Sequence, residues 1–319
     1  MKKILISAIG FMAMNLLQIP AVFGADFPVT IKSCDRDVTF TKAPSRAVSN
    51  DVNITELMLA LGLHDNMVGY TGVSGWRNLS PELVENLGEL PQLSAHYPTR
   101  EILLNADADF YFAGWNYGLK VGGDITPQSL EKFGIQTYEL SESCIHVMQR
   151  SQVSIEDVYN DLRNLGKIFG VNERAEKLIA DYKRQINNAL ASVTKSKTPT
   201  RVFVYDSGED KPFTAAKFAM PTAMIEAAGG RNIIDDVEKS WATIGWEVVV
   251  ERNPELVVII NYGDVTAEQK ITFMKNNPAF KAMDAVKNNQ FLVLEYDEAT
   301  PGPRNITAIQ KLIKALNEL

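Results

Sequence analysis

A twelve-residue pattern that occurs twice without a gap constrains the fold of this chain more than any other feature. Residues 101–112 read EILLNADADFYF, and residues 247–258 read EVVVERNPELVV. In each copy, a glutamate begins a short apolar stretch that is expected to be helical. Four residues that include an acid form a turn, and an apolar strand follows. Two lobes built on one plan normally bind something in the crevice between them, near the strand ends. The repeat therefore predicts two related α/β lobes with a ligand site between them.

The rest of the chain agrees with this division. Short apolar strands alternate with short helices in both halves, which is typical of mainly parallel sheets flanked by helices. From Ser154 the spacing becomes helical as far as Thr194, with a capping box formed by Ser154 and Asp157 and one break at Gly170-Val171. We therefore predict an α/β fold with lobes over residues 26–153 and 199–319, joined by one long bridging helix over 154–194.

The N-terminal segment is typical of a secretory signal peptide. Lys2 and Lys3 precede a run without charge from residue 4 to residue 23, which ends in small residues before Ala25. This pattern predicts a signal peptide over residues 1–24, cleaved after Gly24, and a periplasmic protein. A membrane anchor is the alternative, although polar residues and a proline interrupt the roughly 20 apolar residues that a spanning helix needs. No later run is long and apolar enough to span a bilayer.

Charge and cysteine content narrow the function further. The formal net charge is −7, and it becomes −9 once the leader with its two lysines is removed. No Lys/Arg cluster offers the basic face that nucleic-acid binding requires. The two cysteines, Cys34 and Cys144, are expected to form a disulfide in an exported protein; two buried free thiols are the alternative.

Aromatic and arginine residues gather in the loops that follow predicted strands. Such loops lie at the carboxyl ends of parallel strands and face the crevice, and arginine presents a planar set of donors to oxygen-rich groups. Taken singly, each aromatic residue could equally cap or pack its own loop, and each arginine could be a surface residue. The predicted ligand-binding residues are Trp76, Arg77, Trp115, Tyr117, Tyr205, Phe213, Trp241, Trp246, Tyr262 and Arg304.

Motifs of catalysis and metal binding are missing from the sequence. There is no Gly-x-Ser-x-Gly elbow, Walker loop, dinucleotide fingerprint or His-Glu-x-x-His. The histidines His64, His96 and His146 are scattered, whereas zinc and manganese sites normally combine several His and carboxylate ligands. Asp51, Asp206 and Glu295 show no spacing that supports an acid pair. We therefore expect neither an enzyme nor a metal site.

Several segments resemble periplasmic iron-complex binding proteins of ABC importers. The resemblance covers about residues 28–316. It is carried by the opening CDRDVTF from Cys34, ELMLALGL from Glu56, AAGGRNI from Ala227, Trp246-Glu247 with Asn-Pro254-Glu-Leu, and Pro303-Arg304 near the last helix. Two positions depart from the family pattern, namely Asp35 where glycine is common and Ala108 where proline is usual.

The resemblance implies a fold, a ligand class and a partner. It implies two α/β lobes bridged by one long helix, and a monomeric carrier, without a cofactor, that hands a ferric siderophore to an inner-membrane ABC permease dimer. Cobalamin or haem is the alternative ligand, and a free divalent metal ion is a more distant one. Glu101 and Glu247 occupy the positions where the family places one permease-docking glutamate per lobe. From the residues alone, two readings of these glutamates stay open. They are either helix-start acids favoured by the macrodipole, or one exposed carboxylate per lobe placed to meet basic pockets on a two-subunit partner.

Overall fold

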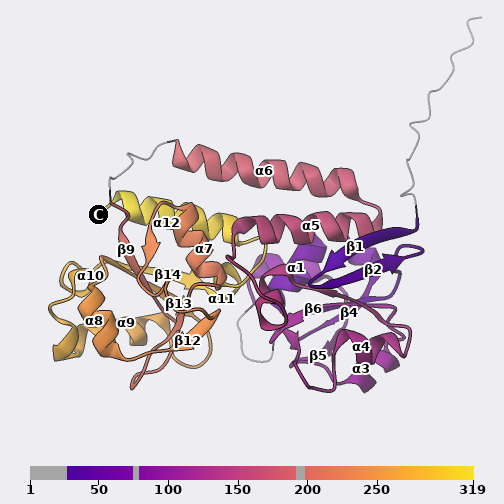
Figure 1. Ribbon diagram of the computed structural model, residues 1–319, viewed down its shortest axis with the longest axis horizontal. Helices are drawn as coiled ribbons and strands as arrows, with labels where there is room; N and C mark the ends of the chain where they lie inside the picture. The colour runs from indigo at the N-terminus through magenta and orange to yellow at the C-terminus, as the bar shows by residue number, and fades with distance from the viewer. Residues whose placement is uncertain (1–26, 75–78, 192–197) are drawn as a thin grey trace, which may run out of the picture.

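The computed structural model describes residues 27–74, 79–191 and 198–319 (Figure 1). The predicted signal peptide and the predicted ligand residues Trp76 and Arg77 lie outside these ranges. Two α/β units lie side by side beneath a layer of helices. We call residues 27–153 the N-terminal lobe and residues 198–319 the C-terminal lobe.

The N-terminal lobe is built on a parallel sheet in the order β5-β4-β3-β6-β7, with β8 also paired to β6. Its strands are β3 (Ala47–Asn50), β4 (Met67–Thr71), β5 (Gln92–Ser94), β6 (Phe110–Trp115), β7 (Gly118–Leu119) and β8 (Gln136–Glu139). Every residue of β3 and β6 is buried. Burial on both faces is expected of a parallel sheet that is covered by helices on both sides.

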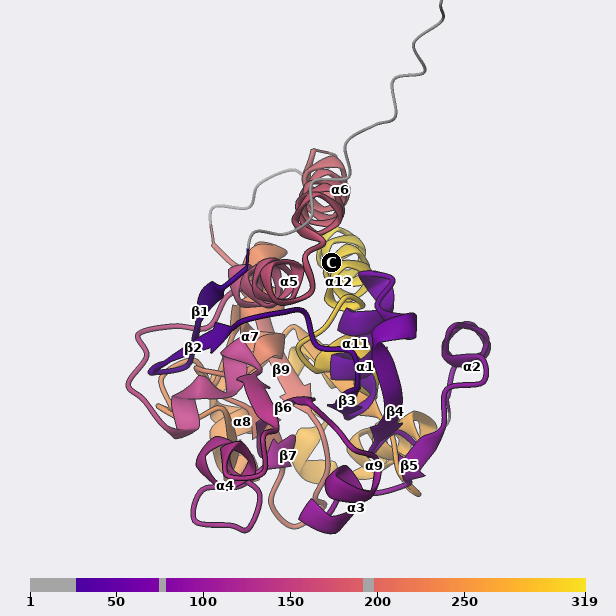
Figure 2. The ribbon, with the colours of Figure 1, turned by 90° about the vertical axis from the view of Figure 1, so that its right-hand side faces the viewer.

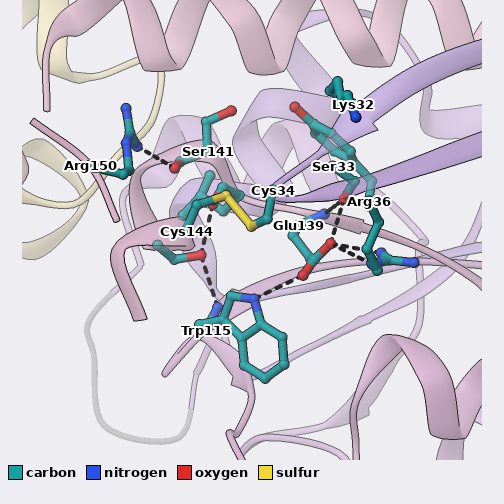
Figure 3. The surroundings of a disulfide bond; sticks show 12 residues. Lys32, Ser33, Cys34, Arg36, Trp115, Glu139, Ser141, Cys144 and Arg150 are labelled. Atoms are coloured by element: carbon teal, nitrogen blue, oxygen red, sulfur yellow. Dashed lines mark hydrogen bonds and ion pairs between the residues drawn. A yellow bond between two sulfur atoms is a disulfide. The ribbon is translucent and has the colours of Figure 1, made fainter. Parts of the chain in front are cut away.

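Short helices and one hairpin surround this sheet. The helical segments are α1 (Val52–Ala60), η1 (His64–Asn66), α2 (Pro81–Leu87), α3 (Arg100–Asn105), α4 (Pro127–Glu131) and η2 (Ser141–His146). The hairpin forms from β1 (Val29–Ser33) and β2 (Arg36–Phe40), which pair antiparallel. The predicted disulfide is confirmed: Cys34, in the hairpin turn, is bonded to Cys144 of η2 with a Cα–Cα distance of 5.3 Å (Figure 3).

The C-terminal lobe repeats the parallel arrangement in the order β11-β9-β13-β14. Its strands are β9 (Arg201–Tyr205), β11 (Arg231–Asn232), β13 (Leu256–Asn261) and β14 (Phe291–Glu295), with the antiparallel pair β10 (Phe213–Ala215) and β12 (Trp241–Thr243) beside them. Its helices are α7 (Met220–Ala227), α8 (Trp246–Arg252), α9 (Ala267–Asn276), η3 (Pro278–Phe280), α10 (Asp284–Lys287), α11 (Tyr296–Ala299) and α12 (Asn305–Asn317). The repeated pattern forms α3 followed by β6 in one lobe and α8 followed by β13 in the other.

The segment predicted as the bridging helix forms two helices rather than one. The expected capping box of Ser154 and Asp157 starts α5 (Ile155–Phe169), and Gly170, with a φ of 72°, ends it in the left-handed conformation that glycine adopts without a Cβ clash. The chain then reverses into α6 (Asn172–Leu190), which packs against both α5 and α12. Figures 1 and 2 show α6 running back over these two helices, so that α6 is the helix that extends from one lobe to the other.

A continuous core also joins the two lobes. One cluster of buried apolar side chains includes Ile54 and Phe112 of the N-terminal lobe, Leu162 of α5, and Val204 and Ile309 of the C-terminal lobe. Such contacts hold the lobes together by packing as well as by the covalent chain. Across the described ranges, we find no helix that combines the length and the hydropathy needed to cross a membrane.

Candidate functional site

A cavity of about 560 Å³ lies between the two lobes, and we call it the interlobe cavity. Its size falls in the range of small-molecule sites. The N-terminal lobe contributes Tyr97, Asn116, Tyr117, Ile145 and His146. The C-terminal lobe contributes Asp206, Phe213, Glu238, Lys239, Ser240, Trp241, Tyr262 and Tyr296.

Strand order explains why these side chains meet. In the C-terminal lobe, Asp206 follows β9, Tyr262 follows β13 and Tyr296 follows β14. Because these strands are parallel neighbours, their carboxyl ends share one edge of the sheet. In the N-terminal lobe, Asp51 and Asn116 follow the paired strands β3 and β6 in the same way. Ligands of open α/β sheets bind at this edge, where the strand order reverses.

Four of the ten predicted ligand residues line the interlobe cavity: Tyr117, Phe213, Trp241 and Tyr262. Phe213 and Trp241 come from β10 and β12, and their rings stack with centroids 5.6 Å apart. Phe213 is 37% exposed although it is a large apolar residue. Aromatic side chains from both lobes therefore line this cavity.

Three other predicted ligand residues, two of them buried and Trp246 half-buried, do not line the interlobe cavity. Trp115 is 6% exposed, and its indole Nε1 donates to Glu139 at 2.9 Å (Figure 3). Tyr205 is 2% exposed, and its ring lies 5.2 Å from that of Trp246. Trp246 also packs 4.6 Å from the ring of Phe280. These contacts hold the three rings within their own lobes, and their ligand role stays a prediction.

Arg304 also lies outside the interlobe cavity. It lines a separate cavity of about 470 Å³ and forms ion pairs with Glu56 at 2.7 Å and Asp297 at 3.1 Å. Burial raises the pKa of Glu56 to about 7, while Arg304 acts in the opposite direction. Since Glu56 belongs to α1 and Arg304 precedes α12, this ion pair connects the two lobes instead of facing a ligand in the interlobe cavity.

The sequence analysis missed Tyr97 and Tyr296, and it named Asp51 only as one of three acids whose spacing does not support an acid pair. The hydroxyl of Tyr97 donates to Oδ2 of Asp51 at 2.9 Å, and the hydroxyl of Tyr296 donates to the same oxygen at 3.2 Å. One carboxylate oxygen thus binds tyrosines from both lobes. The rule that site residues follow strand ends could have found Asp51 and Tyr296, whereas Tyr97 lies in a loop beyond the end of β5.

Asp51 adopts a backbone conformation that is unusual for a residue with a side chain. Its φ is 75° and its ψ is 157°, a region occupied almost only by glycine. Such strain costs about 1–3 kcal/mol and persists only where the surroundings enforce it. At Asp51 the surroundings include the amide of Val52, which donates to Oδ1 at 2.7 Å. The side chain is fully buried.

A second tyrosine–aspartate pair lies in the C-terminal lobe. The hydroxyl of Tyr262 donates to Asp206 at 2.6 Å, and Ser207 donates to the same oxygen at 2.8 Å. Burial raises the pKa of Asp206, opposed by these hydrogen bonds and by Lys270. Nζ of Lys270 binds the backbone carbonyls of Asp206 and Ile260 and lies 4.9 Å from the centroid of the Tyr262 ring. The rings of Tyr262 and Tyr296 are 5.6 Å apart, which places the two pairs side by side.

The lobes meet again beside Ser240. Its hydroxyl donates to Oε1 of Glu142 in η2 at 3.1 Å. Burial raises the pKa of Glu142 to about 8. His146 belongs to the same segment, η2, and lines the interlobe cavity. Burial lowers its pKa, and its Nε2 lies 3.1 Å from the side-chain amide nitrogen of Asn116.

The arrangement is suited to holding a ligand. Aromatic faces supply apolar contact area, and the tyrosine hydroxyls supply directed hydrogen bonds.

His64 contacts the carbonyl of Leu87, away from the cavity. Within residues 27–74, 79–191 and 198–319, no group of three His, Cys, Asp or Glu residues has the geometry to hold a metal ion.

Comparisons with known proteins agree with this description. The family model described as "Periplasmic binding protein" matches residues 48–297. A vitamin B12-binding protein of Pectobacterium atrosepticum is 24% identical over 86% of this chain and 90% of its own.

Two solved structures share the fold. A periplasmic binding protein from Veillonella parvula is 28% identical, with a TM-score of 0.79 over 89% of this chain and 95% of its own. An ABC-type Fe3+-hydroxamate transport system from Saccharomonospora viridis is 23% identical, with a TM-score of 0.76 over 91% and 99%. The family model describes binding proteins rather than enzymes, which supports a role without catalysis. The chain therefore belongs to the periplasmic binding protein family.

Proposed function

We propose that this protein captures a metal chelate, with a ferric siderophore as the first candidate, and delivers it to an ABC permease. The observation that carries the proposal is the interlobe cavity, whose aromatic wall is built from Tyr117 of one lobe and Phe213, Trp241 and Tyr262 of the other. A partly aromatic cavity suits a bulky chelate with an apolar surface.

Cobalamin is the second candidate ligand. The observation in its favour is the similarity to vitamin B12-binding proteins over most of the chain. A corrinoid presents a large flat face and peripheral amides, and both features match an aromatic cavity with polar groups at fixed positions.

The proposal includes export and a permease partner. The secretory pattern of residues 1–24 supports cleavage after Gly24 and a periplasmic location. Glu101 and Glu247, which occupy equivalent positions of the repeated helices α3 and α8, are proposed to contact a permease dimer, one from each lobe. We propose that the carrier acts as a monomer.

Tryptophan fluorescence and calorimetry test the ligand class. The probes are ferrioxamine B, cyanocobalamin, haemin and zinc chloride, and calorimetry reads the coloured probes without inner-filter absorption. We expect a chelate to bind with a Kd of about 1 μM or tighter. Trp241→Phe should remove most of the quenching because Trp241 lines the cavity, whereas the matched variant Trp246→Phe should retain it. Binding of zinc alone, or of no probe, would overturn the proposal.

A further inference from the structure

The contact between Glu142 and Ser240 joins the two lobes at the wall of the interlobe cavity. Glu142 belongs to η2 of the N-terminal lobe, and Ser240 directly precedes β12 of the C-terminal lobe. The hydroxyl of Ser240 donates to Oε1 of Glu142 at 3.1 Å, and Ser240 itself lines the cavity. Both residues are buried. A change in this contact would therefore change the cavity.

Each partner of the contact is fixed within its own lobe. Cys144, also in η2, carries the disulfide to Cys34 of the hairpin turn. On the other side, the backbone carbonyl of Ser240 accepts from the amide of Ala216 at 2.8 Å. The same two segments carry further residues of the cavity wall, namely Ile145, His146, Glu238, Lys239 and Trp241. We therefore expect a loss of the contact to part the lobes at this wall rather than to rearrange either lobe.

The surroundings of Glu142 favour its neutral carboxyl. Within the described residues, Oε2 has no hydrogen-bond partner. Asp157 and Asp161 of α5 raise the pKa of Glu142, and Arg150 lowers it. Arg150 is already engaged, because its Nη2 pairs with Asp157 at 2.5 Å and its Nη1 donates to the carbonyl of Ser141. A buried carboxylate without a partner costs far more than a neutral carboxyl, so ionisation requires contact with water.

The other elements around the contact do not compensate a charge on Glu142. Strand β6 also contacts η2 and carries no Asp, Glu, His, Lys or Arg. On the C-terminal lobe, Glu238 and Lys239 adjoin Ser240 in the chain, and both are exposed. Glu238 is paired with Lys217 at 3.0 Å. Exposed charges of this kind are screened by water and act weakly on a buried group.

We propose that the Glu142–Ser240 contact is a protonation-dependent latch on the interlobe cavity. While Glu142 is protonated, the contact holds the lobes together at the cavity wall; when Glu142 loses its proton, water reaches the carboxylate and the lobes part there. The inference rests on the proposed function for its effect on a ligand, and it specifies how the ligand site is regulated.

The latch predicts the direction of a pH effect on ligand affinity. The pKa of folded Glu142 is about 8. A ligand that needs the closed cavity binds the protonated form, so its affinity should fall as pH rises through this value. Because such coupling is reciprocal, ligand binding near pH 8 should be accompanied by proton uptake.

Calorimetry between pH 7 and pH 9 tests the latch with cyanocobalamin and ferrioxamine B as probes. Cyanocobalamin has no group that titrates in this range, and the ammonium of ferrioxamine B stays largely protonated. From pH 7 to pH 9, wild-type affinity for the probe that binds should fall by about threefold to tenfold, since the protonated fraction of a group with a pKa near 8 falls by about tenfold. An affinity that does not change with pH would overturn the latch.

Glu142→Gln separates the latch from other titrating groups. Its side-chain oxygen can still accept from Ser240, and it has no proton to lose, so its affinity should stay within about twofold over the same range. Asp161 and Glu56, whose pKa values are about 7, are retained in this variant. The exposed Glu173→Gln is the matched control and should follow wild type. A fall in Glu142→Gln as large as that in wild type would refute the proposal.

Ser240→Ala provides a second test if Glu142→Gln does not fold. This variant removes the hydroxyl and keeps Glu142. We expect it to bind the probe more weakly than wild type at pH 7 and to lose less affinity toward pH 9, because the contact is already missing. A pH profile that matches wild type would show that this contact is not the latch.

Amide hydrogen exchange detects the latch without a ligand. Wild type and Glu142→Gln are compared at the same pH, so the intrinsic exchange rates cancel. At pH 9, the amides of η2 and β12 should exchange at least about fivefold faster in wild type, and at pH 7 the two proteins should exchange equally. Equal exchange at both pH values would contradict the latch. If neither chelate binds at any pH, the proposed function fails, while the exchange result still decides the latch.

Discussion

Glu142 is a buried residue whose pKa depends strongly on its surroundings. Its side chain is 1% exposed, and Ser240 of the other lobe donates to Oε1. Within the described residues, Oε2 has no hydrogen-bond partner. Asp157 and Asp161 raise its pKa and Arg150 lowers it, but burial is the largest cause of the rise to about 8.

This rise makes stability depend on pH in a predictable direction. The carboxyl releases its proton near pH 4.5 when unfolded and near pH 8 when folded. Between these values the unfolded state binds fewer protons, so this residue's contribution to stability falls as pH rises. Glu142→Gln removes this pH dependence. Between pH 5 and pH 8, the free energy of unfolding of the variant should therefore rise relative to that of wild type by on the order of a few kcal/mol.

Urea unfolding at pH 5, 6, 7 and 8 checks this expectation. The exposed Glu238→Gln variant is the control, and its free energy of unfolding should change with pH in the same way as that of wild type. Parallel curves for Glu142→Gln as well would contradict the assigned pKa.

At the scale of elements, the β1–β2 hairpin depends on attachments to the N-terminal lobe. The disulfide ties its turn to η2, and Arg36 of β2 binds Glu139 through Nε at 3.0 Å and Nη2 at 2.7 Å (Figure 3). Glu139 also accepts from Ser33 and Trp115. A two-stranded hairpin is marginal by itself, so these attachments hold it on the lobe.

Replacing both cysteines with alanine should therefore destabilise the protein substantially. The sequence separation of 110 residues closes a long loop, for which the chain-entropy model predicts about 4–5 kcal/mol. The midpoint of urea unfolding measures the loss, and wild type treated with a reductant should show a similar shift. A midpoint that stays at the wild-type value would show that the hairpin contacts suffice without the bond.

At the scale of the whole molecule, the repeated helices place one acid on each lobe. Glu101 lies in the first turn of α3 with its side chain 67% exposed, and Glu247 lies exposed in the first turn of α8. Figures 1 and 2 both show α3 and α8 in the lower half of the molecule, away from α6. Because a continuous apolar core joins the two lobes, the distance between the two carboxylates would stay constant.

The double variant Glu101→Ala, Glu247→Ala separates docking from ligand capture. Neither residue lines the interlobe cavity, so chelate affinity should stay within about twofold of wild type, while uptake in cells should fall at least about tenfold because paired charges set the register of an interface. Glu131→Ala together with Glu251→Ala is the matched control. Normal uptake by the double variant would remove the docking assignment.

Local signals in the sequence determined the elements. The capping box of Ser154, the break at Gly170 and the repeated helix–strand units were all predictable because each depends on residues close together along the chain. The family resemblance agreed with the two-lobed fold. The reversal between α5 and α6 was not predicted, since the sequence marks a break in a helix but not the direction in which the chain leaves it.

Only the tertiary structure decided which side chains form the site. Trp115 and Tyr117 are two residues apart, yet one ring packs in the core and the other lines the cavity. Asp51 and Tyr296 are 245 residues apart and share a hydrogen bond. The sequence by itself determined the strands, the helices and the two-lobed plan, because these follow from local periodicity and caps. The orientation of a loop side chain depends instead on sheet order and lobe packing, which bring distant residues together.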